Sequence, residues 1–260
     1  MNVYDVSYRE RNAASDSEKG PVMAVAGING SRSKRNTCVQ NFRARTVVES
    51  AYNVALLKLN ADTDSSMCCV QAKIDEWYIA YQDSPKLQQL IARAIPDKEA
   101  CVVQVGCGNS RLAPGLVDDG WRNLVNVDIS RAALQQMQRR YARSHPDMGF
   151  LLADATHLKD WSDGCIDAVV DKGTLQSLML LQDGIVRCQK FASEMHRVLR
   201  PGGVMIQILG RPGMQIYLKT PEIRWAKVVH SEVPRDGIGG SAHIYVFHKA
   251  GTEVSEFAER

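Results

Sequence analysis

Two glycines and an aspartate are the residues of this sequence whose types and spacing best suit chemistry. The run Cys101–Val105 is apolar and mostly β-branched, so we predict a strand there, and it ends at Gly106-Cys107-Gly108. Glycine at that place lets the backbone approach a ligand closely. A second predicted strand, Leu124–Val127, ends on Asp128, twenty residues beyond Gly108, which suits a carboxylate that accepts hydrogen bonds from ribose hydroxyls. The spacing therefore predicts a nucleoside-binding site.

The same turn argues against a dinucleotide. The fingerprint G-x-G-x-x-G needs a third glycine, and the sequence has Arg111 in that place, so a nucleoside without phosphates fits better than a pyrophosphate. Taken alone, the two glycines are equally typical of a tight turn. Asp128 alone is typical of an acid at a helix N-terminus, where Ser130 would also serve as a cap. Only the combination at this spacing favours a ligand.

Two further acids end predicted strands. Asp154 follows Gly149–Ala153, and Asp171 follows Ile166–Val170. Ligands of open parallel sheets bind at the carboxyl ends of the strands, so we expect Asp128, Asp154 and Asp171 to converge on one crevice. For Asp154 alone, a turn or cap acid is nearly as good an interpretation.

The remaining pattern alternates helices and strands and then closes with two strands. We predict a fifth strand at Val204–Leu209 after Arg200-Pro201-Gly202-Gly203, and then a hairpin of Arg224–Val233 with Ala242–His248 around the glycine-rich residues 236–240. The fold class is therefore α/β, with a mostly parallel seven-stranded sheet and an antiparallel C-terminal hairpin strand. Helices are predicted at Arg111–Asp119, Arg131–Ser144 and Gly184–Leu199.

Upstream of the first strand we predict three regions. Residues 1–46 form a basic extension, with eight Lys or Arg against four Asp or Glu and little periodicity, and we predict that it is disordered. Residues 47–73 form a helical segment. A helical region continues over about Val70–Ile95, with a fresh start at Ser84-Pro85, and its aromatic residues are expected in the core. Residues 74–250 are then the main domain, and 251–260 are a tail.

Composition narrows the class of protein. The chain has 260 residues, 45% hydrophobic and 23% charged, and a net charge of +3. The first 46 residues carry +4, with eight basic and four acidic residues, which leaves −1 for the rest of the chain. No apolar run reaches the length of a membrane helix, and the near-neutral main domain argues against extensive contact with nucleic acid. We expect no membrane association and a cytoplasmic location.

Metal and thiol chemistry are not expected from local spacing. The seven cysteines form no C-x-x-C pair and the six histidines no H-x-x-x-H pair, so we predict no metal site and reduced, mostly buried thiols. Cys107, inside the glycine turn, is better explained by the packing of a small residue than by nucleophilic chemistry.

These residues resemble the class I S-adenosylmethionine-dependent methyltransferases, whose sheet is Rossmann-like. The resemblance covers roughly residues 75–249, and it is closest to the methyltransferase-like group that includes lysine methyltransferases of translation elongation factor 1-alpha. Two features differ: that group usually has Asp where this chain has Gln176, and its upstream Trp-x-x-Arg-Tyr element is reduced to Tyr52. The segments that carry the resemblance are Glu76-Trp77-Tyr78, Val105 to Leu112, Asn126 to Ser130 and Val170 to Leu175.

The resemblance implies a cofactor, a substrate class and a set of site residues. The cofactor is S-adenosylmethionine, and a protein substrate, elongation factor 1-alpha, is suspected. Asp154 would face the adenine, and Asp171 to Thr174 would border the transferred methyl group, with Asp171 and Thr174 as the catalytic candidates. The implied cofactor-binding residues are Gly106, Gly108, Asn109, Asp128, Ile129, Asp154, Trp77 and Tyr78.

The implied reaction is in-line methyl transfer from a sulfonium to a nucleophile, which requires orientation and desolvation. A target lysine must arrive neutral, so Asp171 would orient it or help to remove its proton. For Asp171 and Lys172 a strand-end ion pair or cap is the competing interpretation. Three functions stay open: a protein methyltransferase, a methyltransferase of a small molecule or RNA, and a non-catalytic adaptor that keeps the fold. A nicotinamide dehydrogenase is disfavoured by Arg111 and the closing hairpin.

Overall fold

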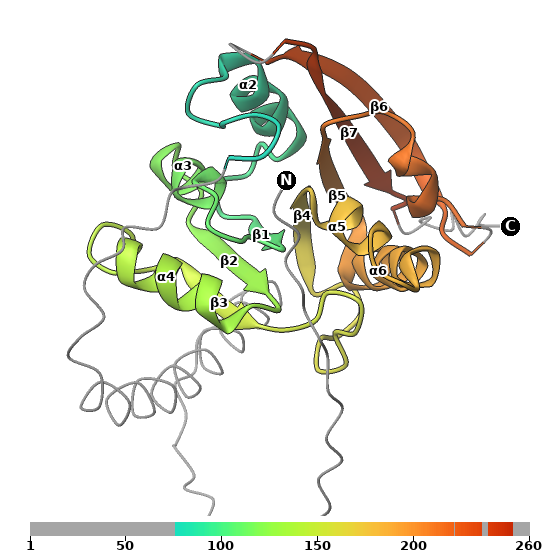
Figure 1. Cartoon of the computed structure of the whole chain (residues 1–260), viewed down its shortest axis with the longest axis horizontal. Helices are drawn as coiled ribbons and strands as arrows, with labels where there is room; N and C mark the ends of the chain where they lie inside the picture. Colours follow the sequence, from blue (N-terminus) through green and yellow to red (C-terminus); the bar gives the residue numbers. More distant parts are fainter. Residues whose placement is uncertain (1–75, 221, 236–238, 252–260) are drawn as a thin grey trace, which may run out of the picture. The chain divides into compact units, whose positions relative to one another are not determined.

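The computed structural model describes residues 76–220, 222–235 and 239–251 (Figure 1). The predicted basic extension, the helical segment 47–73, Tyr52 and the tail beyond residue 251 lie outside the described residues.

One seven-stranded sheet organises the described residues, in the order β3-β2-β1-β4-β5-β7-β6. Strands β1 to β5 pair in parallel, whereas β7 is antiparallel to both β5 and β6. The predicted fold class is confirmed. The strands are β1 (Cys101–Val105), β2 (Asn123–Asp128), β3 (Gly149–Leu152), β4 (Ile166–Lys172), β5 (Leu199–Leu209), β6 (Trp225–Pro234) and β7 (Ser241–Lys249).

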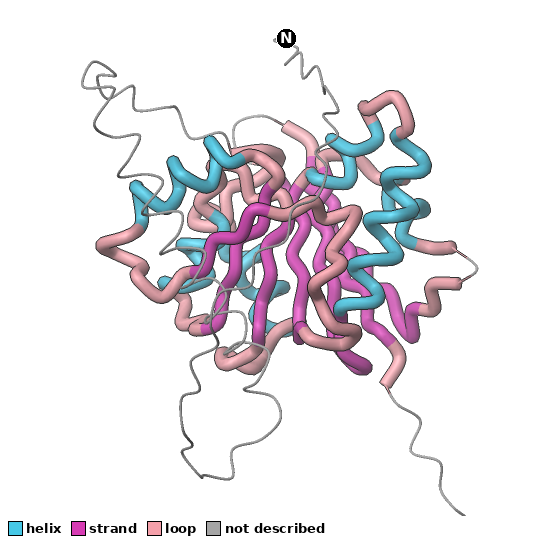
Figure 2. Tube along the Cα trace, turned by 90° about the horizontal axis from the view of Figure 1, so that it is seen from below, coloured by secondary structure: helices cyan, strands magenta, loops and turns pink. Residues whose placement is uncertain are grey.

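Helices cover both faces of the sheet, as the tube of Figure 2 shows. Leu87 and Leu112, from two helices, pack on one face with β-strand residues such as Val102. Leu175 and Phe191, from two other helices, pack on the opposite face. Because both faces are covered, the central strands are continuous apolar runs. The helices are α2 (Pro85–Ala94), α3 (Leu112–Asp118), α4 (Arg131–Tyr141), α5 (Thr174–Met179), α6 (Gly184–Val198) and the 3₁₀ helix η1 (Met214–Leu218).

The prediction of a helix from about Val70 was wrong over residues 76–83, and its first residues, 70–75, lie outside the described residues. Residues 77–83 form no helix, and α2 begins only at Pro85, where the Ser84 side chain accepts a hydrogen bond from the Leu87 amide at 3.3 Å. The predicted fresh start at Ser84-Pro85 is confirmed, because serine caps a helix and proline suits its first position. Tyr81 is buried as expected, but the side chain of Trp77 is 50% exposed and is not part of the core.

Two short elements were not predicted: α5 and η1. Helix α5 has only six residues, too few for a hydrophobic period to be read. Strand β5 also begins at Leu199, before the Pro-Gly-Gly turn, rather than at Val204. Among the described residues, no helix combines the length and apolar character needed to cross a membrane.

Candidate functional site

The carboxyl ends of β1 and β2 are joined through Asp128. Its two carboxylate oxygens accept hydrogen bonds from the backbone amides of Gly108 and Ser130, each at 2.7 Å. The Cys107 amide donates to the carbonyl of Val127 at 3.2 Å, which ties the glycine turn to β2 a second time. Since a carboxylate oxygen can accept more than one hydrogen bond, Asp128 keeps the capacity to accept from ligand hydroxyls.

The two glycines of the turn have different surroundings. Both have positive φ, +57° at Gly106 and +51° at Gly108, a conformation that favours glycine. A Cβ atom on Gly106 would lie 2.0 Å from the Thr174 hydroxyl oxygen, whereas one on Gly108 would meet no atom within 4 Å. The space beside Gly108 and Asp128 is therefore open to a ligand, while Gly106 is packed against the end of β4.

Asp171 is a buried acid whose side chain holds the start of α5. It is fully buried, and its oxygens accept from the amides of Thr174 at 2.8 Å and Leu175 at 3.4 Å and from Gln207 Nε2 at 3.4 Å. Burial raises the pKa of Asp171 to about 6, against the opposing effect of these hydrogen bonds. Thr174 in turn donates its hydroxyl hydrogen to the carbonyl of Val105 at 3.0 Å. These two catalytic candidates connect β4 to the glycine turn, and their catalytic role stays a prediction.

Asp154 lies one strand further, after β3. Its Oδ1 accepts from both the amide and the hydroxyl of Thr156, at 2.8 and 2.7 Å, so the carboxylate stabilises the turn that follows the strand. The Ala153 amide donates to the Asp128 carbonyl at 3.1 Å and keeps this turn beside β2. Ile129 (68% exposed) and Leu152 (41%) present apolar side chains at the same two strand ends.

Cys107 is a buried thiol rather than a nucleophile. It is 2% exposed, and burial, followed by the charge of Asp128, raises the pKa of its thiol. A thiol in such surroundings is inert, since the thiolate is the reactive form. The packing interpretation of Cys107 is confirmed.

Trp77 and Tyr78 lie above the ends of β4 and β5. A Cβ atom on Gly173 would come within 3.2 Å of both rings, and one on Gly210 would meet the Tyr78 ring at 2.5 Å. The two rings meet edge to face, with centroids 6.0 Å apart. Tyr78 has a φ of +65°, unusual for a residue with a side chain, and burial together with the charge of Asp171 raises the pKa of its phenol to about 12.

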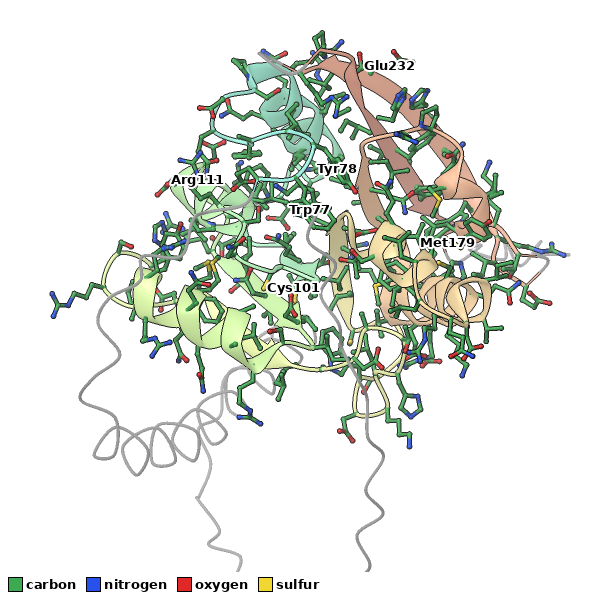
Figure 3. All side chains as sticks on the ribbon, in the orientation of Figure 1. Trp77, Tyr78, Cys101, Arg111, Met179 and Glu232 are labelled. Carbon is green, nitrogen blue, oxygen red and sulfur yellow. The ribbon has the colours of Figure 1, made fainter. Side chains whose placement is uncertain are left out.

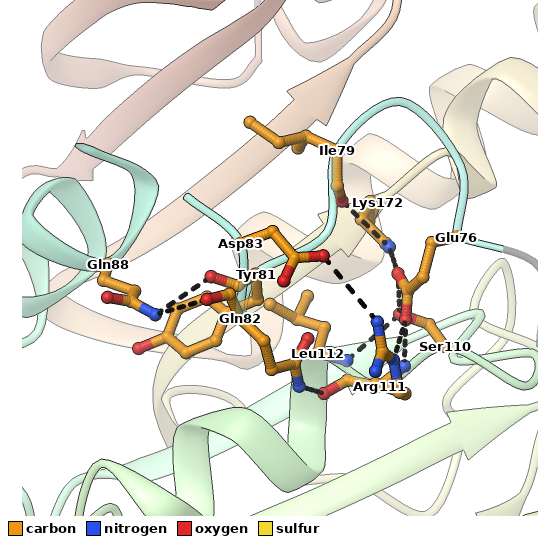
Figure 4. A network of polar contacts seen from close by, with 10 residues as sticks. All are labelled: Glu76, Ile79, Tyr81, Gln82, Asp83, Gln88, Ser110, Arg111, Leu112 and Lys172. Atoms are coloured by element: carbon orange, nitrogen blue, oxygen red, sulfur yellow. Dashed lines mark hydrogen bonds and ion pairs between the residues drawn. The ribbon is translucent and has the colours of Figure 1, made fainter. Parts of the chain in front are cut away.

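Glu76 holds this aromatic pair to the glycine turn, in the network that Figure 4 shows. Its carboxylate accepts from the Arg111 amide, from the Ser110 hydroxyl at 3.1 Å and from the Lys172 ammonium group. The Lys172 side chain is 3% exposed; burial lowers its pKa, and Glu76 opposes that shift. The acid that pairs with Lys172 is thus Glu76.

The segment 76–84 is further fastened to α3. Gln82 donates to the Arg111 carbonyl at 2.6 Å, and the Tyr81 hydroxyl donates to Asp119. Gly115 permits this contact, because a Cβ there would lie 2.6 Å from the Tyr81 ring. Sequence reasoning missed Glu76 as the centre of the network; a charged residue directly before two aromatics was the only local signal.

The predicted site residues thus lie at one edge of the sheet. Strands β3, β2, β1 and β4 lie side by side (Figure 1). Asp154 lies just beyond β3, Asp128 and the glycine turn lie at the ends of β2 and β1, and Asp171 lies near the end of β4. Trp77 and Tyr78, labelled in Figure 3, lie over the ends of β4 and β5. This edge could hold an adenosine-like group through Asp128 and the open backbone at Gly108.

Similarity to known proteins decides the family. Residues 103–207 match the methyltransferase domain model. A frog protein (Xenopus laevis) named eEF1A lysine and N-terminal methyltransferase is 39% identical over 130 residues, 49% of this chain, but the chain spans only 18% of that protein's length. A mouse protein (Mus musculus) named EEF1A lysine methyltransferase 4 is 32% identical over 181 residues, covering 64% of this chain and 69% of the mouse protein. The chain belongs to the class I S-adenosylmethionine-dependent methyltransferases. Its place among them is the group that includes the eEF1A lysine methyltransferases.

Solved structures agree on the fold of this methyltransferase domain. TrmN from Thermus thermophilus superposes with a TM-score of 0.50 at 18% identity, over 63% of this chain and 48% of that chain. The cofactor of the family is S-adenosylmethionine, and the residues present fit it: Gly108 leaves room for a ligand, and Asp128 lies against that room. Ile129 and Leu152 offer apolar surface beside it.

Proposed function

We propose that residues 74–250 of this methyltransferase form a catalytic domain that methylates a lysine of a protein, and that translation elongation factor 1-alpha is the substrate. The observation that carries the substrate is the shared similarity to relatives named for eEF1A lysine methylation, one of them matched over 69% of its length. S-adenosylmethionine, when bound, supplies an electrophilic methyl group on a sulfonium. The chain's own residues must bind and orient it and bring a neutral amine to it.

In this proposal the residues at the carboxyl ends of β1, β2 and β3 bind the cofactor. Asp128 accepts from the ribose hydroxyls, Asn109 and the Gly108 backbone lie along the same ligand, and Asp154 with Ile129 borders the adenine. Support comes from the open space at Gly108 and the exposed apolar side chain of Ile129.

The resemblance implied that the aromatic pair binds the cofactor; in this proposal Trp77 and Tyr78 receive the substrate lysine instead. The half-exposed ring of Trp77 offers an apolar surface for the methylene stem of a lysine, whose charged form is disfavoured in apolar surroundings. Because the pKa of Tyr78 is raised to about 12, its hydroxyl keeps its proton at neutral pH and acts as a hydrogen-bond donor rather than as a base. Tyr78 is therefore proposed as an orienting group.

Asp171 and Thr174 are proposed as positioning residues of this site. Both Asp171 oxygens accept hydrogen bonds from the start of α5, and Thr174 packs on Gly106, so a change at either residue moves the glycine turn. Because the Asp171 side chain is fully buried, a direct role in removing the lysine proton would need the packing around it to open.

We also propose that the protein is located in the cytoplasm. Cys107 and Cys188 are buried free thiols, which suits a reducing compartment such as the cytoplasm.

The test is methyl transfer to purified elongation factor 1-alpha. The chain, labelled S-adenosylmethionine and the factor are incubated together, and mass spectrometry locates the methyl group. We expect methylation of a lysine side chain, reduced by Trp77→Ala more through KM than through kcat. Label in RNA or in small molecules instead would contradict the protein substrate, and binding of the cofactor without any transfer would favour an adaptor.

A further inference from the structure

The C-terminal hairpin brings two histidines and a glutamate together on one face. His230 and Glu232 are two residues apart on β6, so their side chains point to the same side of the sheet. On β7, His243 is the register partner of Glu232, and Tyr245 is the register partner of His230. Cross-strand partners share a face, so all three polar side chains gather in one place.

The donor atoms of these side chains are close enough to share one ion. His230 Nε2 lies 3.2 Å from His243 Nδ1, and His243 Nδ1 lies 3.7 Å from Glu232 Oε1. All three ligand atoms lie within 4.8 Å of one another. Two donors on a tetrahedral zinc ion lie ~3.4 Å apart, given zinc–nitrogen bonds of about 2.05 Å. The observed separations therefore bracket the distance that zinc needs.

The two imidazoles lie in nearly one plane, with one nitrogen of each ring directed at the other ring. Their planes differ by 15° and their centroids are 5.4 Å apart, so the two nitrogens face one another along the line between the rings. Two imidazoles on a tetrahedral ion would have centroids about 5.2 Å apart, because each ring centre lies just behind its nitrogen. In the observed arrangement each nitrogen faces the other, so each ring would have to turn by about 35° to direct its lone pair at a shared zinc ion.

The neighbouring Tyr245 ring fixes the orientation of His230, and the site is accessible to solvent on the side of Glu232. The Tyr245 ring stacks on His230, with centroids 4.3 Å apart and planes within 12°, which fixes the direction of the His230 ring. The His243 side chain is only 13% exposed, whereas Glu232 is 59% exposed. An ion here would have three protein ligands and a fourth position open to water.

We propose that His230, Glu232 and His243 form a binding site for a divalent transition-metal ion, with zinc as the best fit. Imidazole nitrogens and a carboxylate are ligands that zinc accepts, and two imidazoles disfavour magnesium and calcium, which prefer oxygen. This is the one group of at least three such side chains, among the described residues, with metal-binding spacing.

The site is separate from the cofactor site but lies toward the same edge of the sheet. His243 is the register partner of Leu209, the last residue of β5, and the Tyr78 ring packs against Gly210, which follows it. Figure 3 labels Glu232 on the hairpin, apart from Trp77 and Tyr78. In the described residues β6 pairs only with β7, so an ion bound by both strands clamps the outermost strand to the sheet.

The competing explanation is a plain hydrogen bond between two histidines. The 3.2 Å separation also fits an N–H donated from one imidazole to the other, with Glu232 as a nearby acceptor. Such a pair has no particular affinity for zinc. Local sequence gave no sign of either arrangement, because the histidines are thirteen residues apart and meet only through the register of the hairpin.

The experiment is calorimetric titration of the metal-free full chain with Zn²⁺ alone. We expect one site of micromolar affinity that is lost in His230→Ala and His243→Ala and weakened in Glu232→Gln, in each case by more than about tenfold, since even an outer-shell partner is worth that much. The matched control is His157→Ala, which removes an exposed histidine outside the cluster and should leave zinc affinity unchanged. Unchanged affinity in His243→Ala, or an equal loss in His157→Ala, would overturn the proposal.

A second measurement covers the case in which a variant does not fold. X-ray absorption of the wild-type chain with one equivalent of Zn²⁺ should show nitrogen and oxygen ligands at ~2.0–2.1 Å. A shell of sulfur ligands at ~2.3 Å would assign the ion to cysteines and reject the hairpin site. Neither readout depends on methyl transfer, so the result is independent of the proposed function.

Discussion

Asp128 is the residue on which cofactor binding depends most directly in this account. Its carboxylate holds the amides of Gly108 and Ser130 and faces the open space beside Gly108. We expect Asp128→Ala to weaken binding of S-adenosylmethionine by about 2 kcal/mol, or about thirtyfold in Kd, through loss of two hydroxyl contacts. Calorimetry measures this change. Asp183→Ala, which removes an exposed acid that caps no amide, is the control. An unchanged Kd in Asp128→Ala would refute the ribose assignment.

The two glycines of the turn should respond differently to the same substitution. Both Gly106→Ala and Gly108→Ala force a side chain into positive φ, which costs roughly 1–2 kcal/mol. Gly106→Ala adds a clash with Thr174, so we expect a further loss of about 1–3 kcal/mol of unfolding free energy in urea titrations. Gly108→Ala meets no atom and should instead mainly weaken cofactor binding. Equal losses of stability in the two variants would contradict the packing at Gly106.

Asp171 should make stability depend on pH. Its pKa is raised by burial from 3.8 to about 6, so the folded state binds the extra proton across that window. The contribution of Asp171 to the free energy of unfolding therefore falls as the pH rises from 3.8 to about 6. The Asp171→Asn variant lacks this pH dependence, because asparagine does not titrate. Between about pH 4 and about pH 7, the unfolding free energy of the variant should therefore rise relative to that of the wild type by up to about 3 kcal/mol. Urea unfolding at several pH values measures it, and a difference that is constant with pH would show that Asp171 does not titrate there.

At the residue scale the sequence predicted some site residues and missed others for a physical reason. The glycine turn and Asp128 are twenty residues apart and follow adjacent strands, so spacing alone was informative. Glu76 and Lys172 are separated by 96 residues and meet only in the folded chain. The side-chain partners of Asp171 likewise depend on packing that no local pattern encodes.

At the scale of elements, the segment 76–84 depends on the buried pair of Glu76 and Lys172. We expect Glu76→Ala to lower the free energy of unfolding by about 3–5 kcal/mol, because it leaves a buried ammonium without its carboxylate. The double variant Glu76→Gln with Lys172→Met carries neither charge, so its free energy of unfolding should be well above that of Glu76→Ala. Glu99→Ala breaks the exposed pair with Arg122 and should change stability by at most about 1 kcal/mol. Equal effects of Glu76→Ala and Glu99→Ala in urea unfolding would contradict the role of the buried pair.

The elements themselves were predicted where a pattern is long or sharply ended. The strands before Asp128 and Asp171 were found because apolar runs stop at a polar residue. Residues 77–83 were predicted as helix from the spacing of their aromatics, but Tyr78 has positive φ and the segment is held by side-chain contacts with α3. Tertiary contacts overrode the local pattern there.

At the scale of the whole molecule, the strand order gathers the site. In chain order β2 and β3 come between β1 and β4, yet in the sheet β1 lies between β2 and β4, which brings Asp128, the glycine turn and Asp171 to one edge. The sequence predicted the parallel sheet and its closing hairpin, but the meeting of His230 with His243 required the register of that hairpin.

Calorimetric titration of the purified chain shows whether this edge of the sheet binds S-adenosylmethionine. NAD serves as the comparison ligand, because it shares the adenosine but carries the pyrophosphate that Arg111 disfavours in the turn. We expect micromolar binding of S-adenosylmethionine and none of NAD. Tighter binding of NAD, or binding of neither ligand, would contradict this expectation.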